Sequence, residues 1–168
     1  MGSKERLYAD IMAVHPEVTG SCNLVIVKQP DNTTVKFIVD CGLFQERKYS
    51  KNNESLPFIP ANIDFCLVTH NHVDHVGRLP FLVNKGYDKE IFISETTSKL
   101  LPLALEDSHK VLRDVAKRQN RPCLYTESDV AQTMKLIRPC KYNQTVQIRP
   151  NIKATFFQNG HLMGPQAF

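Results

Sequence analysis

Four potential metal ligands within six residues constrain this chain more than any other feature of its sequence. They are His70, His72, Asp74 and His75, and they include half of the six histidines in the 168 residues. A lone histidine in a loop is usually solvated or hydrogen-bonded to a neighbour, but solvation is a poor explanation for four such side chains in one short stretch. The cluster therefore predicts a metal site.

The cluster follows residues 64–69, which are apolar and partly β-branched after the first residue and predict a buried strand. Open α/β sheets place their active sites at the C-terminal ends of strands, which is where these ligands lie. In extended backbone His70, His72 and Asp74 would share one side, and a helix beginning near Asp74 would bring it beside His75. Two imidazoles would then bind one metal, and Asp74 with His75 a second. Zinc suits such ligands first, with iron or manganese as substitutes.

Two more polar side chains stand at the ends of predicted strands. Asp40 ends the strand over residues 35–40, and a buried carboxylate needs a partner because an unpaired charge is costly to bury. That partner is either the second ring nitrogen of a metal-bound histidine or the backbone of the next turn. His161 follows the strand over residues 152–157 and is flanked by glycines. Together with His70 and His72 it would complete three nitrogen ligands.

The remaining patterns alternate strands with helices. Strands are predicted over residues 8–14, 22–28, 35–40, 64–69, 91–93, 145–149 and 152–157. Helices are predicted over residues 79–85, from Ser94 or Thr96 to residue 119, and from the capping-box variant at 126–129 to Pro139. Pro102 predicts a kink or a restart of the long helix. Residues 22–40 predict a hairpin, and residues 43–63 a loop or a short helix.

Composition is that of an ordinary globular domain, with 42% hydrophobic and 23% charged residues. The formal charge of +4 permits an anionic partner without requiring one. Basic residues crowd one segment, where a solvated helix face is the first explanation and a contact with an anion the second: Arg113, Lys117, Arg118 and Arg121.

The five cysteines are odd in number and form no C-x-x-C pair. Cys22, Cys41 and Cys66 lie in or beside apolar strands, which predicts core thiols in a reducing compartment. No apolar run approaches the ~20 residues needed to cross a bilayer, and no secretion signal is seen. We therefore expect a cytoplasmic protein, or a nuclear one in a eukaryote, with no membrane partner.

The motif His70-x-His72-x-Asp74-His75 resembles the signature of the metallo-β-lactamase superfamily. Flanking segments are similar to its beta-CASP branch, the nucleases typified by the cleavage and polyadenylation endonuclease subunit and its prokaryotic relatives. These segments are residues 19–22, 39–45, 77–80, 124–129 and 160–164. The resemblance implies that His70, His72 and His161 hold one zinc, and that Asp74 and His75 hold a second.

The resemblance also implies catalytic roles for two carboxylates. Asp40 would be the acid of the first motif, supporting the site without binding metal, and Asp74 would also take part in proton transfer. Two metals would lower the pKa of a bridging hydroxide and stabilise the charge that develops during phosphodiester cleavage. The implied activity is zinc-dependent cleavage of RNA, with single-stranded RNA as the partner and basic segments along its backbone. No residue is assigned to RNA binding.

The implied fold is α/β, the N-terminal half of a metallo-β-lactamase αββα sandwich, with a mixed sheet and flanking helices. The family's fourth-motif aspartate, inserted cap domain and C-terminal histidines have no counterpart in residues 1–168. We therefore expect a partial domain from a longer protein, holding one zinc where the complete site holds two. Its protein partner would be the missing C-terminal half or a second copy of the chain.

Two other functions remain open. One is hydrolysis of a small molecule by a member of the same superfamily, such as a thioesterase or a lactonase. The other is a metal-binding subunit without catalysis. Residues 124–129 and the basic segment favour the nuclease over the small-molecule hydrolase, and the intact motif at residues 70–75 argues against an inactive subunit.

Overall fold

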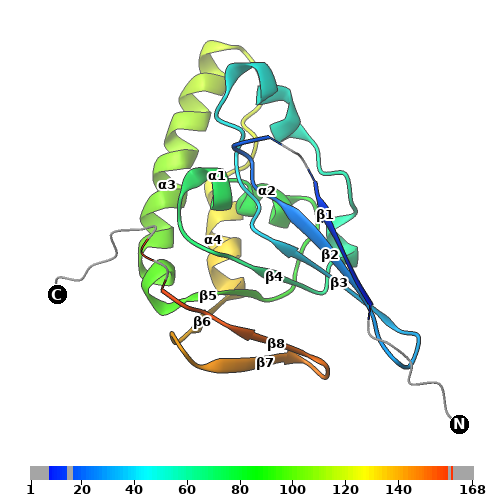
Figure 1. Cartoon of the computed structure of the whole chain (residues 1–168). Coiled ribbons are helices and arrows are strands. Elements are labelled where there is room, and N and C mark those ends of the chain that lie inside the picture. Colours follow the sequence, from blue (N-terminus) through cyan, green and yellow to red (C-terminus); the bar gives the residue numbers. More distant parts are fainter. Residues whose placement is uncertain (1–7, 15–16, 159, 161–168) are drawn as a thin grey trace, which may run out of the picture.

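A computed structural model describes residues 8–14, 17–158 and 160 of the chain (Figure 1). One six-stranded sheet has the order β1-β2-β3-β4-β5-β6, and a separate pair is formed by β7 and β8. The strands are β1 (Tyr8–Ala13), β2 (Asn23–Lys28), β3 (Thr34–Val39), β4 (Phe65–Leu67), β5 (Ile91–Ser94), β6 (Ile137–Cys140), β7 (Thr145–Arg149) and β8 (Ile152–Thr155). The helices are α1 (Val73–Val76), α2 (Leu79–Asn84), α3 (Glu95–Arg118) and α4 (Glu127–Leu136), with 3-10 helices η1 (Arg47–Glu54) and η2 (Pro60–Asn62). The α/β architecture with a mixed sheet and flanking helices is confirmed.

Strand direction changes once across the sheet. Strands β1, β2 and β3 are antiparallel, as the predicted hairpin requires, and β3, β4, β5 and β6 are parallel. Parallel strands end at the same edge of a sheet, so the segments that follow β3, β4, β5 and β6 all emerge together. The polar side chains that follow β3 and β4 are therefore neighbours.

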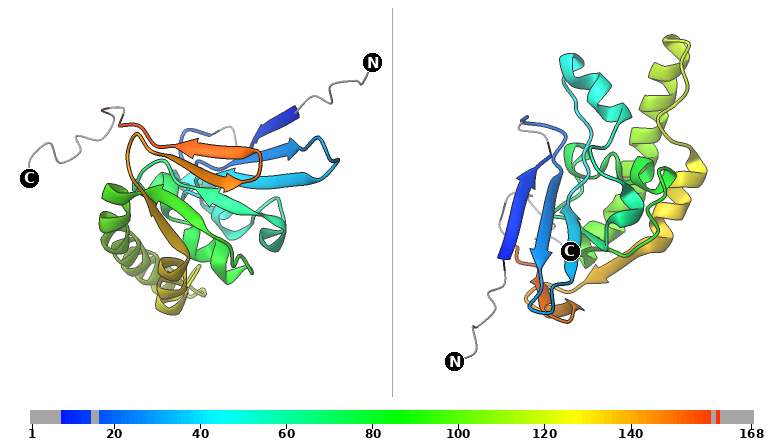
Figure 2. Two further views of the ribbon diagram at one scale, coloured as in Figure 1. Left: turned by 90° about the horizontal axis from the view of Figure 1, so that it is seen from below. Right: turned by 90° about the vertical axis from the view of Figure 1, so that its right-hand side faces the viewer.

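The two faces of the sheet bury different side chains. Ile38, Cys66 and Ile91 are neighbours in the register and lie in the core beneath the helices. Phe37 and Phe65 point to the other face, where their rings stack with centroids 4.5 Å apart. The β7–β8 hairpin covers this second face (Figure 2), and its side chains pack against Phe65 and Phe92. The three cysteines expected in the core are buried, and all five are free thiols.

Two expectations about prolines need correction. Helix α3 does not restart at Pro102, because Leu101 and Leu105 are both fully buried and anchor the helix on either side of it. Helix α4 ends at Leu136 and not at Pro139, and residues 137–140 form strand β6. Proline disfavours helical backbone in the residue before it and is tolerated in an edge strand, which is the place that β6 takes.

Within the described ranges, none of the helices combines the length and apolar character needed to cross a membrane.

Candidate metal centre

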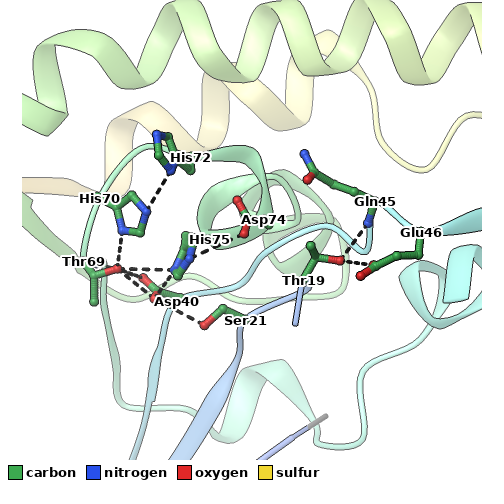
Figure 3. A network of polar contacts seen from close by, with 10 residues as sticks. All are labelled: Thr19, Ser21, Asp40, Gln45, Glu46, Thr69, His70, His72, Asp74 and His75. Atoms are coloured by element: carbon green, nitrogen blue, oxygen red, sulfur yellow. Dashed lines mark hydrogen bonds and ion pairs between the residues drawn. The ribbon is translucent and has the colours of Figure 1, made fainter. Parts of the chain in front are cut away.

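Residues 68–75, which we call the histidine loop, run from the end of β4 into α1, at the edge where the parallel strands end (Figure 3). The three imidazoles of this loop are close together: the ring centroid of His70 is 4.7 Å from that of His72 and 4.0 Å from that of His75. Helix α1 begins directly after His72, which is the N-cap residue in extended backbone. The predicted change from extended to helical backbone thus occurs at this point and folds His75 back onto His70.

The nitrogens of His70 and His72 are spaced like two ligands of one ion. Nε2 of His70 lies 3.2 Å from Nδ1 of His72. Two nitrogens bound to a tetrahedral zinc at their usual bond length are about 3.3 Å apart. The donor set and its spacing therefore fit a zinc ion.

The two side chains of the second expected pair are also close together, since Oδ2 of Asp74 lies 3.6 Å from Nε2 of His75. Within the described part of the chain, however, no group of three or more His, Cys, Asp or Glu side chains is arranged to hold a metal ion. Each pair thus brings together two potential ligands, and its role in binding a metal stays a prediction.

His161, the expected further ligand, lies outside the described residues. The chain that leads to it returns to the same edge of the sheet. Phe156, just after β8, forms a bridge with Tyr142, just after β6. The hydroxyl of Tyr142 in turn donates to Oγ of Ser94 at the end of β5, at 3.1 Å. The last described residues therefore approach the edge that carries the histidine loop.

Asp40 links this loop to the end of β3. The residue is 2% exposed, and its carboxylate accepts hydrogen bonds from the backbone N–H of Thr69 at 2.8 Å and from the Thr69 hydroxyl at 2.9 and 3.0 Å. Nδ1 of His75 lies 2.8 Å from the carboxylate, and the Ser21 hydroxyl donates to it at 3.5 Å. Of the two partners considered from the sequence, the histidine ring is the one observed.

The contact with Asp40 orients His75 and changes its proton affinity. Because Nδ1 faces Asp40, the other nitrogen, Nε2, faces Asp74. Burial alone would lower the pKa of His75, but the hydrogen bond to Asp40 and the charges of Asp40 and Asp74 together outweigh it. The pKa of His75 is therefore raised above its ordinary value.

Gly42 allows two backbones to approach each other closely at the site. A Cβ atom at this position would lie 1.6 Å from the carbonyl oxygen of Asp74 and 2.6 Å from the backbone nitrogen of His75. On either side of Gly42, Cys41 N–H donates to the His75 carbonyl at 2.8 Å, and Leu43 N–H donates to Val73 at 3.0 Å. The segment after β3 is thus bonded directly to the backbone of α1.

The side chain of Arg78 stabilises the segment after β3 from the interior of the protein. It is fully buried, and its Nε donates to the Gly42 carbonyl at 2.6 Å. Its Nη1 donates to the carbonyls of Asn52 and Ser55, at 3.0 and 3.2 Å, and the guanidinium lies over the ring of Phe44. One buried cation therefore connects the loop after β3 to η1.

The supporting residues Thr69, Ser21 and Arg78 are the part of the site that sequence reasoning missed. Ser21 and Arg78 lie within segments that carry the family resemblance, and Thr69 lies directly before the histidine motif, but none of the three belongs to a ligand type. The hydroxyl of Thr69, directly before His70, was the one available signal.

Two residues of the basic segment, Arg113 and Arg121, form ion pairs with Glu127 and Glu54, at 3.7 and 2.6 Å.

We expect Gly42→Ala to destabilise the fold by at least about 3 kcal/mol, because the added methyl meets backbone atoms that no rotamer change can move away. Urea unfolding measures the effect. The matched control is Gly86→Ala, where the methyl enters open space and only the positive φ is unfavourable, at about 1–2 kcal/mol. Equal stability of the two variants would contradict the close approach.

Residues 27–168 match a family model described as the metallo-beta-lactamase superfamily domain. The chain is 32% identical over 148 residues to ribonuclease TTHA0252 of Thermus thermophilus, covering 88% of this chain and 31% of that protein. It is 31% identical over 150 residues to transcription termination factor FttA of Methanocaldococcus jannaschii, covering 88% and 22%. It is 28% identical over 161 residues to cleavage and polyadenylation specificity factor subunit 3-II of Arabidopsis thaliana, covering 92% and 25%.

Among solved structures, a beta-lactamase domain protein from Burkholderia ambifaria aligns with a TM-score of 0.38 and 19% identity, over 86% of this chain and 44% of that one. The chain spans between 22 and 31% of the length of the three curated relatives named above. These relatives are of the beta-CASP kind that the sequence resembles. The family match over residues 27–168 shows that the chain belongs to the metallo-β-lactamase superfamily, in which the cofactor is a metal.

Proposed function

We propose that the chain forms the metal-binding part of a zinc-dependent hydrolase that cleaves RNA. The observation that carries the proposal is the pair of ligand nitrogens on His70 and His72, 3.2 Å apart. The choice of RNA is supported by the relatives, which include a ribonuclease and a cleavage and polyadenylation subunit. Because the chain spans less than a third of those relatives, the complete activity is assigned to a longer parent protein.

His70 and His72 would hold one zinc together with His161, and Asp74 and His75 would hold a second. When bound, the metal would lower the pKa of a water toward neutrality and offset the negative charge that develops on the phosphate. A catalytic zinc needs three protein ligands, and the second pair supplies two. We therefore expect one zinc in this chain and two in the parent protein.

The two carboxylates of the site would have different roles. The side chain of Asp40 is 3% exposed and already accepts hydrogen bonds, so its role is to hold the ring of His75. The side chain of Asp74 is 23% exposed, which leaves it a path to water. Asp74 is therefore the carboxylate that would exchange protons during cleavage.

A basic end of the molecule offers a path for the RNA. Helix η1 and the C-terminal end of α3 lie at the same end (Figure 1), and a cavity of about 640 Å³ is lined by residues of η1, α2, α3 and the α3–α4 loop. Seven cations lie on η1, at the C-terminal ends of α2 and α3 and in the α3–α4 loop, namely Arg47, Lys48, Lys51, Lys85, Lys117, Arg118 and Arg121. Glu54 forms an ion pair with one of them, Arg121, at 2.6 Å. The excess of positive charge favours a polyanion over a neutral small molecule.

The parent protein would supply what residues 1–168 lack. These parts are the fourth-motif aspartate, the cap domain and the C-terminal histidines that the resemblance implies. Ile11 supports the presence of a further layer. By the strand register it lies on the same face of the sheet as Phe65, which the β7–β8 hairpin covers, but Ile11 itself is 73% exposed. That layer would come from the parent's C-terminal half or from a second copy of the chain. The proposed compartment is the cytoplasm, or the nucleus in a eukaryote.

Metal analysis of the purified chain should find about one zinc per molecule, which a chelator removes. His72→Ala should weaken zinc binding at least tenfold. Loss of a residue that only supports a metal ligand already lowers metal affinity by about 10–100-fold, and His72 is expected to bind the zinc itself. Competition with a chromophoric chelator gives the affinity. Wild-type protein that neither carries zinc nor binds it would contradict the metal centre.

In the parent protein we expect Asp74→Ala to slow cleavage of single-stranded RNA at least about 100-fold, because it removes both a ligand and a proton carrier. The control is Asp88→Ala, which removes a carboxylate that is 71% exposed on the surface. Wild-type protein that hydrolyses a thioester and leaves RNA intact would instead be a small-molecule hydrolase. Metal-loaded protein without either activity would be a non-catalytic subunit.

Reversing two charges with Lys117→Glu and Arg118→Glu should weaken RNA binding and make it less sensitive to salt. Each lost phosphate contact lowers the slope of log affinity against log salt by about 0.7. Fluorescence anisotropy with labelled single-stranded RNA measures both quantities. The control, Lys28→Glu with Lys153→Glu, makes the same charge change on exposed residues of β2 and β8. An equal effect of both pairs would show that only net charge matters.

A further inference from the structure

We propose that Thr69 is a positioning residue whose hydroxyl connects Asp40 to His70 and thereby determines which ring nitrogen of His70 carries the lone pair that can bind a metal. The inference deepens the proposed function and rests on it only in taking His70 as a ligand. It starts from one atom: Oγ1 of Thr69 is 2.9 and 3.0 Å from the two oxygens of Asp40 and 2.9 Å from Nδ1 of His70 (Figure 3). The same oxygen is 3.5 Å from Nδ1 of His75, which is its longest contact.

The hydroxyl has a single hydrogen, so it donates to only one of these neighbours. As a carboxylate, Asp40 can only accept. If the Thr69 hydroxyl donated to His70, its oxygen would face two carboxylate oxygens within 3.0 Å with no hydrogen between them. The hydroxyl therefore donates to Asp40 and accepts at the contact with His70. Nδ1 of His70 must then carry the hydrogen.

A neutral imidazole protonated at Nδ1 has its lone pair at Nε2. In His70 this is the nitrogen that lies 3.2 Å from Nδ1 of His72, on the side of the candidate metal. The opposite tautomer would place a hydrogen where the metal is expected. Thr69 thus prepares His70 for ligation before any metal arrives.

Asp40 acts on a second histidine without an intermediary, since Nδ1 of His75 lies 2.8 Å from Oδ2. One carboxylate therefore sets two tautomers, that of His75 directly and that of His70 through the threonine hydroxyl. The arrangement predicts different effects on the two tautomers for variants of Thr69 and of Asp40. Loss of the hydroxyl should change the tautomer of His70 alone, because Nδ1 of His75 is 2.8 Å from Asp40 but 3.5 Å from Oγ1 of Thr69. Loss of the carboxylate should change the tautomers of both rings.

The test uses metal-free chain labelled with ¹⁵N in histidine, at a pH where the imidazoles are neutral. Long-range ¹H–¹⁵N correlation spectra should show both His70 and His75 protonated at Nδ1 in the wild type. Thr69→Val should shift His70 toward the Nε2-protonated form and leave His75 unchanged, and Thr69→Ser should restore the wild-type pattern. Asp40→Ala should shift both histidines. Valine matches threonine in shape at an exposed position, so the fold is retained.

Zinc alone is the second probe. Thr69→Val should weaken zinc binding by about 10–100-fold, the usual effect of removing a partner behind a metal ligand, and Thr69→Ser by much less. A wild-type His70 protonated at Nε2 would overturn the proposal without any variant, as would a Thr69→Val protein with unchanged His70 signals and zinc affinity. Neither measurement involves RNA. A confirmed tautomer assignment therefore remains valid if the parent protein fails to cleave RNA. If the tautomer measurement contradicts the proposal, RNA cleavage by the parent protein does not restore it.

Discussion

One buried carboxylate connects the three segments that form the metal centre. Asp40 ends β3 in left-handed backbone, with φ at 65°, and its own N–H donates to the Leu67 carbonyl of β4. Its side chain then reaches both ends of the histidine loop, through Thr69 at the start and His75 in α1. Aspartate tolerates left-handed backbone better than most residues, so the same side chain satisfies the conformation and the contacts.

The position of the loop relative to β3 depends on backbone contacts as much as on side chains. Gly42 lies against the carbonyl of Asp74, and the buried guanidinium of Arg78 donates hydrogen bonds to the carbonyl oxygens of Gly42, Asn52 and Ser55. Hydrogen bonds to a charged group contribute about 1.5–3 kcal/mol each, which offsets part of the cost of burying the guanidinium. Gly42, which has no Cβ, and the cation of Arg78 thus help to position the candidate ligands without a side-chain contact to them.

The sheet arrangement explains why ligands from distant parts of the sequence can meet. Strands β3, β4, β5 and β6 run parallel, so the segments after them emerge at one edge, and the bridge between Tyr142 and Phe156 brings the chain after β8 to that edge as well. On the opposite face, the aromatic rings of Phe37, Phe65 and Phe92 give the hairpin a surface to pack on. The edge that carries the candidate metal ligands and the face that the hairpin covers are therefore consequences of a single strand order.

Local pattern determined much of this protein. The alternation of β2 and β3, the capping box at Thr126 and Asp129, and the ligand cluster after β4 were all predictable, because each depends on residues close in sequence. Strand β6 was not, because its helix-like pattern ends in a strand only when β5 is available to pair with it. The partner of Asp40 stayed open between two choices for the same reason. Which side chains touch across 29 or 35 residues of chain, as Asp40 does with Thr69 and His75, is decided by strand order, and only the tertiary structure contains it.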